Sequence, residues 1–253
     1  MNSRTKKLLG VAGIIVITAF IILNVDVSIR RGVNGTYQEV HMPLYVKWIQ
    51  FLARHYEYTR IAKEITAGQK LDEEKVLALF QWTHENIRPI TPDMPRMDDH
   101  ILNIIIRGYG TSEQAQDVFV NLCVYAGMPA FWQRICDKDR RVRYSLSFVK
   151  IDGKWRVFDV YFNKYFRTSD GRIASIDDLI SNKALLDNAG LDDIIVGGIP
   201  YKELYYNLSQ FAVPPTLRSE KQMPFKRILF ELKKILNKKR SHAARLDRVL
   251  AVC

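Results

Sequence analysis

The first strong feature of the hydrophobic pattern is an uninterrupted apolar run near the start of the chain. No charged residue occurs between Leu8 and Val25, where the sequence reads LLGVAGIIVITAFIILNV. As a helix this run would be roughly 27 Å long, close to the thickness of a bilayer's hydrocarbon core. The alternative is a cleaved signal peptide, but the small-residue cleavage pattern is missing after the run. We therefore expect residues 8–25 to form an uncleaved transmembrane anchor.

Three later segments show the three- and four-residue spacing typical of amphipathic helices. Residues 46–65 have a mixed apolar pattern that fits one or two helices, whereas 72–87 and 112–126 have clearer stripes. The segment 72–87 opens with three acidic residues, which favour a helix N-terminus. The segment 112–126 ends before Gly127, a common helix stop.

Strand-like patterns follow the last of these helices. They cover residues 131–136, 142–151 and 155–161. Asp152-Gly153, between the last two, is a preferred loop for a type I′ hairpin. Helices followed by antiparallel strands predict an α+β fold in which helices pack on an antiparallel sheet.

These patterns divide the chain into five parts. A basic flank, 1–7, precedes the anchor at 8–25. Glycine and proline residues break any periodicity in 26–42, which we interpret as a linker. The globular domain then covers 43–213, and the remaining residues, 214–253, form a basic tail.

The tail has its own amphipathic pattern. Pro224 can begin a helix, and an apolar stripe runs from Phe225 to Leu236 with basic residues beside it. Residues 224–240 therefore predict a basic amphipathic helix. Two interpretations stay open: this helix binds anionic lipid or an acidic partner, or it packs on its own domain with its basic face in solvent.

Charge is concentrated at the two ends of the chain. The formal net charge is +11, and basic residues before Leu8 and from Arg218 onward account for nearly all of it. A domain that binds nucleic acid would carry this charge on its folded surface, so we expect no nucleic-acid partner. Basic residues ahead of the anchor favour a cytoplasmic N-terminus and an exported domain.

Cysteine usage indicates neither metal binding nor extensive cross-linking. Cys123, Cys136 and Cys253 are an odd number without metal-ligand spacing. We therefore expect no disulfide framework and no zinc site, and no motif indicates a cofactor.

The Asp152-Gly153 loop fixes the register of the hairpin. If Ile151 pairs with Lys154, then Leu146 faces Asp159, and Tyr144 lies diagonally beside Asp159 on the same face. Large apolar residues share that face, so we expect it to be the buried one. A buried carboxylate is costly without a partner. We therefore expect Asp159 to accept a hydrogen bond from Tyr144 or from a backbone amide near Ser112.

Two segments together resemble the transglutaminase-like superfamily, whose domains have a papain-like fold. The first is RGYGTSEQAQDVFVNLCVYAGMPA from Arg107, and the second is YSLSFVKIDGKWRVFD from Tyr144. The resemblance covers roughly residues 72–180. It places Ser112, Tyr144 and Asp159 at the positions of the family's catalytic cysteine, histidine and aspartate.

The resemblance implies a cysteine nucleophile, a histidine base and an aspartate that orients the histidine. This chain has a serine and a tyrosine at the first two positions, and a tyrosine hydroxyl titrates near pH 10. One interpretation is an inactive, membrane-anchored binding or scaffold module of the cell envelope with a peptide or glycan ligand. Ser112 would then serve as a helix N-cap.

The alternative interpretation is an active hydrolase or acyltransferase whose site is rebuilt around Ser112. His84 or His100 would supply the base. Asp99 and His100 lie just before the Gly-Tyr-Gly turn and are expected to line the same cleft. The sequence names no substrate for either interpretation.

Overall fold

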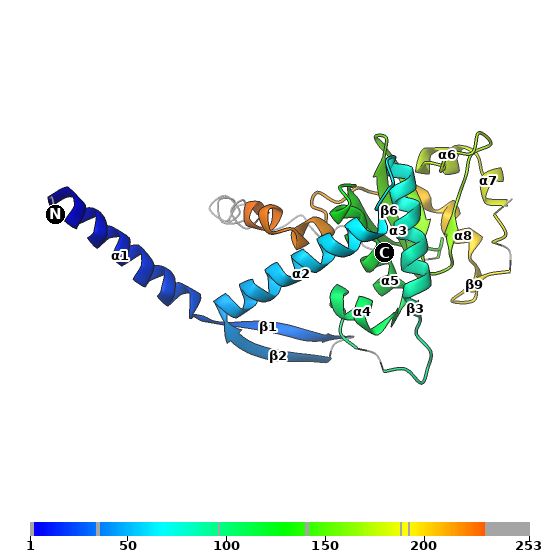
Figure 1. The fold of residues 1–253 in the computed structure, drawn as a ribbon. Helices are drawn as coiled ribbons and strands as arrows, with labels where there is room; N and C mark the ends of the chain where they lie inside the picture. Colours follow the sequence, from blue (N-terminus) through cyan, green and yellow to red (C-terminus); the bar gives the residue numbers. More distant parts are fainter. Residues whose placement is uncertain are drawn as a thin grey trace, which may run out of the picture. The chain divides into compact units, whose positions relative to one another are not determined.

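The computed structural model describes residues 3–33, 36–95, 97–139, 142–187, 189–191 and 193–230 (Figure 1). Its contacts divide the chain into two compact units, Met1–Tyr56 and Glu57–Cys253.

The first unit contains helix α1 (Ser3–Leu23), strands β1 (Asp26–Val33) and β2 (Thr36–Pro43), and the start of helix α2 (Leu44–Ile65). The large apolar side chains of α1 that are described are exposed, Leu8 at 71% and Leu23 at 40%. Across the described ranges, no helix combines the length and the apolar character needed to cross a membrane.

Strands β1 and β2 form an antiparallel hairpin where the sequence led us to expect an irregular linker. The pairing runs from Asp26↔Pro43 to Val33↔Thr36. Glycine did not prevent regular pairing in this segment, because Gly32 pairs with Tyr37.

The second unit is built around a four-stranded antiparallel sheet in the order β5-β6-β7-β8. The strands are β5 (Ala130–Cys136), β6 (Arg143–Ile151), β7 (Lys154–Asp159) and β8 (Lys164–Tyr165). The predicted hairpin register is confirmed, because Ile151 pairs with Lys154. Asp152 and Gly153 have φ values of 50° and 78°, positive at both positions as a type I′ turn requires.

Helices α3 (Asp72–Asn86), α4 (Ile101–Arg107) and α5 (Ser112–Tyr125) contribute to the core on one side of this sheet. Every residue from Gln114 to Val124 is buried, so α5 is enclosed on all sides. Phe80 of α3, Phe119 of α5 and Phe158 of β7 form an aromatic cluster with ring centroids 5.5–5.9 Å apart. The α+β class expected from the sequence is confirmed.

Both faces of the sheet are buried, whereas the sequence led us to expect one. The face that was expected to be buried, with Leu146, Phe148 and Val157, packs in a second core with Tyr201 and Leu204. The segments that contribute to this core or lie next to it are α6 (Ile176–Ser181), α7 (Ala184–Asp187), β9 (Ile195–Val196), β10 (Ile199–Pro200), α8 (Lys202–Tyr206) and η1 (Leu208–Gln210). Residues 144–149 of β6 and 156–159 of β7 are buried without a break, as burial on both faces requires.

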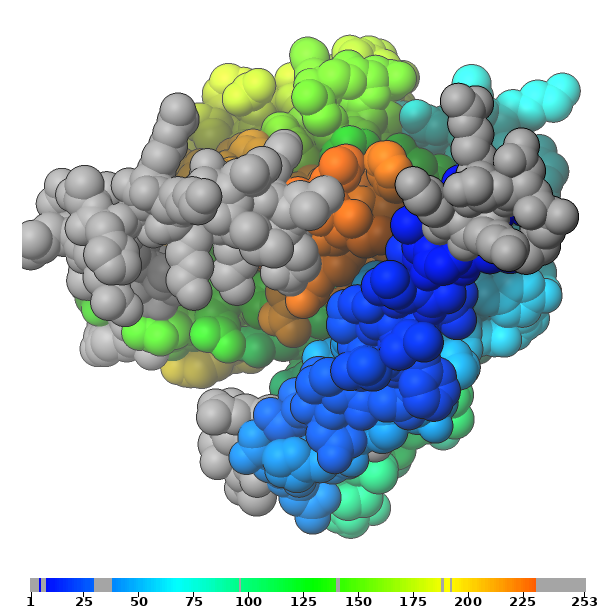
Figure 2. Space-filling model, turned by 90° about the vertical axis from the view of Figure 1, so that its left-hand side faces the viewer, coloured from blue at the N-terminus to red at the C-terminus, as the bar shows by residue number. Residues whose placement is uncertain are grey.

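Short elements complete the second unit. β3 (Arg88–Pro89) and β4 (Tyr109–Gly110) pair in parallel, and η2 (Ser219–Gln222) precedes a helical stretch from Pro224 to Phe230. The last described residues, orange in Figure 2, lie on the molecular surface. The rest of the predicted amphipathic helix, through residue 240, lies outside the described residues. Cys136 is disulfide-bonded, which the odd cysteine count did not lead us to expect, and Cys123 is a buried free thiol.

Candidate functional site

Helix α5 begins with a capping box in which Thr111, rather than Ser112, is the N-cap. The Thr111 hydroxyl accepts from the Gln114 amide at 3.3 Å, and the Gln114 side-chain oxygen accepts from the Thr111 amide at 3.0 Å. These bonds satisfy donors that every helix N-terminus leaves free. Ser112 is the first residue of the helix and is half-buried. The expectation that Ser112 caps the helix is therefore wrong by one position.

Gln114 also ties the preceding segment to the start of α5. Its Nε2 donates to Asp99 Oδ1 at 2.7 Å, and its Oε1 accepts from Arg107 Nη2 at 2.9 Å. A Cβ at Gly110 would come within 2.9 Å of the Gln114 side chain, so the turn needs glycine there. Asp99 thus lies against the first turn of α5, in the neighbourhood that the sequence suggested. His100 is the N-cap residue of α4.

Asp159 ends β7 and is completely buried, as expected. One carboxylate oxygen, Oδ1, accepts from Gln116 Nε2 at 2.8 Å and from the backbone amides of Tyr161 and Phe162 at 2.9 and 3.3 Å. The other, Oδ2, accepts from the Tyr201 hydroxyl. Burial raises the pKa of Asp159, and these donors offset part of that rise.

Tyr144 is not a hydrogen-bond partner of Asp159, which corrects the expected pairing. Its hydroxyl is buried and meets no hydrogen-bond acceptor or donor among the described residues. It still lies close enough to Asp159 to lower the pKa of the carboxyl. Its ring stacks on Phe162 and meets Tyr201 edge-on, with centroids 5.7 and 5.6 Å away. Burial, and then the negative charge of Asp159, raise the pKa of Tyr144 above its usual value near 10.

Tyr201 and Gln116 are the partners that sequence reasoning missed. Tyr201 lies 42 positions after Asp159, and its hydroxyl also bonds the Tyr205 hydroxyl at 2.6 Å. Gln116 accepts from the Ser147 hydroxyl, so it links α5, β6 and the end of β7. Nothing local in the sequence marks Tyr201. Gln116 is one of several buried polar residues on α5, so the sequence does not single it out.

The structure brings Tyr144 and Asp159 into one buried cluster and places Ser112 beside it along α5. Ser112 precedes Gln116 by four residues, so the two lie on the same face of the helix. Within the described ranges, no hydrogen bond joins Ser112 to Tyr144 or Asp159. His84, on α3, bonds through Nδ1 to the backbone oxygen of Val160 at 2.8 Å, next in sequence to Asp159.

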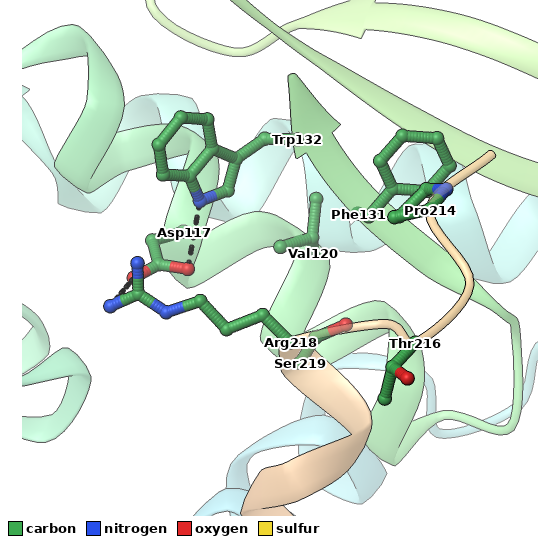
Figure 3. A pocket seen from close by; sticks show the side chains of 8 residues that line it. All are labelled: Asp117, Val120, Phe131, Trp132, Pro214, Thr216, Arg218 and Ser219. Carbon is green, nitrogen blue, oxygen red and sulfur yellow. Dashed lines mark hydrogen bonds and ion pairs between the residues drawn. The ribbon is translucent and has the colours of Figure 1, made fainter. Parts of the chain in front are cut away.

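A cavity of about 240 Å³ lies elsewhere along α5, lined by Asp117, Val120, Phe131, Trp132, Pro214, Thr216, Arg218 and Ser219 (Figure 3). Trp132 Nε1 donates to Asp117 Oδ1 at 2.9 Å. Burial raises the pKa of Asp117, and the nearby positive charge of Arg218 offsets part of that rise. In the part of the chain that the structure describes, no three acidic, histidine or cysteine side chains gather as metal ligands.

Comparison with known proteins gives a likeness in fold. No protein-family model and no curated protein matches the chain. Similar solved structures include a candidate protease from Parabacteroides distasonis, with 14% identity, TM-score 0.35 and coverage of 53% of this chain and 35% of that one. Another is a candidate cysteine protease from Cytophaga hutchinsonii, with 17% identity, TM-score 0.38 and coverage of 50% and 45%.

A third similar structure is a TGase, with 15% identity, TM-score 0.32 and coverage of 67% of this chain and 51% of that one. The chain spans between 35% and 51% of the lengths of these three solved chains. Likenesses at this level carry no argument about what this chain does.

Proposed function

We propose that the chain is a membrane-attached, transglutaminase-like binding or scaffold module of the cell envelope that does not catalyse acyl transfer. Its ligand is a peptide or a glycan. The observation that carries the proposal is the environment of Asp159, which is buried and already accepts hydrogen bonds from Gln116, Tyr201 and two backbone amides. That carboxylate is a structural acceptor and has no imidazole to orient.

The chemistry of the other two positions supports the same conclusion. A serine hydroxyl becomes a nucleophile only when a nearby base takes its proton. At position 144 the side chain is a phenol whose pKa is raised by burial, so it holds its proton at neutral pH. Cys123 does not replace the missing thiol, because it lies three turns along α5 and burial raises its pKa.

Membrane attachment is proposed for residues 8–25, with the N-terminus in the cytoplasm and the domain exported. Support comes from the uncharged run and from the exposed apolar side chains of α1. Basic residues precede the run, as the positive-inside rule requires for this orientation. The basic segment 224–240 is proposed to bind anionic lipid or an acidic partner.

The second candidate function is a hydrolase or acyltransferase that uses Ser112 and a histidine. The bond from His84 Nδ1 to the oxygen of Val160 favours this candidate, because a carbonyl accepts only from a protonated Nδ1. In a neutral ring the other nitrogen, Nε2, is then free to accept a proton. Such a base would sit near the end of β7.

Labelling with a serine-directed fluorophosphonate separates the two functions. For the binding module we expect no labelling of the wild-type chain above that of Ser112→Ala. The second candidate requires labelling that is lost in Ser112→Ala and strongly reduced in His84→Gln. Ser181→Ala is the matched control, because Ser181 is an exposed serine on α6. Labelling at Ser112 would overturn the proposal of an inactive module.

A further inference from the structure

The cavity beside α5 is separate from the cluster around Asp159 and has a chemistry of its own. Asp117 comes from the middle of α5, Trp132 from β5, and the other wall from the segment 214–219 (Figure 3). The Ser219 hydroxyl donates to the backbone oxygen of Ala130 at 2.5 Å and holds this segment against β5. The cavity therefore has a fixed rim built from three parts of the chain.

Asp117 is a nearly buried acid with one long ionic contact. Its side chain is 12% exposed, and it pairs with Arg218, whose Nη2 lies 3.9 Å from Oδ2. That separation is too long for a hydrogen bond. The Arg218 side chain is 69% exposed, so it is not held in place by packing. An ionised Asp117 thus has an oxygen that a second cation can approach.

The electrostatic surroundings favour a positive ligand at this oxygen. The negative charges of Asp99 and Glu113 act on Asp117 and disfavour its ionised form. Arg134, which could have balanced them, is already paired with Glu113 at 2.8 Å. A cation beside Asp117 would reduce this repulsion, although the chain as a whole is strongly basic.

The walls suit an apolar stem attached to that cation. Val120, Phe131 and Pro214 line the cavity together with the indole of Trp132. Aromatic rings attract cations through the negative charge density of their faces. The indole N–H of Trp132 is already used by Asp117, which leaves its ring as the part available for contact.

We propose that this cavity is a binding site for a small organic cation, a guanidinium on a short apolar stem. The guanidinium lies against Asp117, and the stem lies along Phe131, Trp132 and Pro214. Arg218 already places one guanidinium near this carboxylate, so it competes with the ligand. The proposal does not depend on whether Ser112 is catalytic.

Calorimetric titration of the full chain in a nonionic detergent tests the site, with n-butylguanidinium as the probe and neutral n-butylurea as its shape-matched control. We expect the cation to bind about tenfold or more tightly than the urea, and Asp117→Asn to remove that difference. Asp117→Asn keeps an oxygen for the Trp132 N–H, so the fold is expected to persist. Asp177→Asn, an exposed acid on α6, should bind as the wild type does.

The direction in which Arg218→Ala changes the affinity for n-butylguanidinium decides whether the proposal holds. If Arg218 competes for Asp117, removing it should strengthen binding of n-butylguanidinium. If Arg218 itself is the recognition group, for an anionic ligand, the same variant should not bind the cation more tightly than the wild type does. That result overturns the proposal, and so does equal binding of the cation and the urea by the wild-type chain. Because Arg218 is exposed, this variant stays informative even if Asp117→Asn fails to fold.

Discussion

At the scale of single residues, the most consequential group is the carboxylate of Asp159. An ionised carboxylate in an apolar interior is unfavourable unless its oxygens are hydrogen-bonded. Here the donors come from α5, from the turn after β7 and from Tyr201. The Asp159 side chain therefore links three segments of the chain by hydrogen bonds. With a tyrosine at position 144, this acid is still satisfied by other donors.

Replacing Tyr201 or Tyr144 by phenylalanine tests which of the two hydroxyls donates a hydrogen bond to Asp159. Tyr201→Phe removes a hydroxyl that bonds Asp159, so it should lower the free energy of unfolding by about 1–3 kcal/mol. Tyr144→Phe removes a buried hydroxyl without a hydrogen bond, so it should leave stability unchanged or slightly raised. Urea denaturation of the two variants beside the wild type measures both effects. A larger loss for Tyr144→Phe would contradict the assignment of Tyr201 as the donor.

The raised pKa of Asp159 predicts a pH dependence of stability. A folded-state pKa above the unfolded value of about 3.9 gives stability that is fully present below that pH and is lost as pH rises through the folded pKa. The stability of wild type minus that of Asp159→Asn should therefore fall as pH increases from about 4. Denaturation at a series of pH values measures this difference. A rise instead would mean that the donors around Asp159 outweigh its burial. Asp159→Leu, which offers no acceptor, should be less stable than Asp159→Asn throughout.

At the scale of elements, the start of α5 gives a test that separates two adjacent residues. Thr111→Ala removes the N-cap and should cost about 0.5–2 kcal/mol of stability. Ser112→Ala, at the first helical position, removes no cap and should cost almost nothing, because alanine is the better helix former. Thermal or chemical denaturation of the two variants checks the order. Equal losses of stability in the two variants would contradict the assignment of Thr111 alone as the N-cap.

The elements that were predicted well are those with strong local signals. The hairpin of β6 and β7 follows from Asp152-Gly153, because that dipeptide accepts the positive φ values that the turn needs. Helices α3 and α5 follow from acidic or capping residues at one end and a glycine or proline beyond the other. Their existence needed no knowledge of the rest of the chain.

The features that were missed depend on contacts between distant segments. The face with Leu146 and Phe148 was predicted to be buried, but the segment around Tyr201 and Leu204 that covers it was not foreseen, because its short elements leave almost no periodic pattern. The choice of Tyr201 over Tyr144 as donor to Asp159 is a matter of side-chain geometry after that segment has packed. The hairpin of β1 and β2 was also missed, because glycine residues in this segment suggested that no regular element forms there.

At the scale of the whole molecule, the arrangement of charge and apolar surface is the main guide to location. The net charge of +11 sits largely at the two ends, and the largest run of exposed apolar side chains lies in α1. Contiguous exposed apolar surface typically marks a region that contacts a membrane or a protein partner. A lipid phase also accounts for the basic residues that flank the run.

Membrane attachment is tested by placing charge in the middle of the apolar run. Val16→Lys with Ile17→Lys should release much of the chain from the membrane pellet after a sodium carbonate wash, because each central lysine costs about 2.5–3.5 kcal/mol on insertion scales. Ile180→Lys with Ile195→Lys adds the same charge at exposed isoleucines of the second unit and should leave the chain in the pellet. Release of the wild-type chain, or equal retention of both double variants, would count against an anchor at residues 8–25.

Orientation is tested with sealed inside-out membrane vesicles. If the N-terminus is cytoplasmic, the domain lies in the vesicle lumen, and added protease should leave it intact until detergent opens the membrane. The opposite orientation exposes the domain on the outside, where the protease would degrade it without detergent. A tag at the N-terminus provides the internal control, because it should be removed while the domain survives. Survival of the tag together with loss of the domain would reverse the proposed topology and place the domain in the cytoplasm.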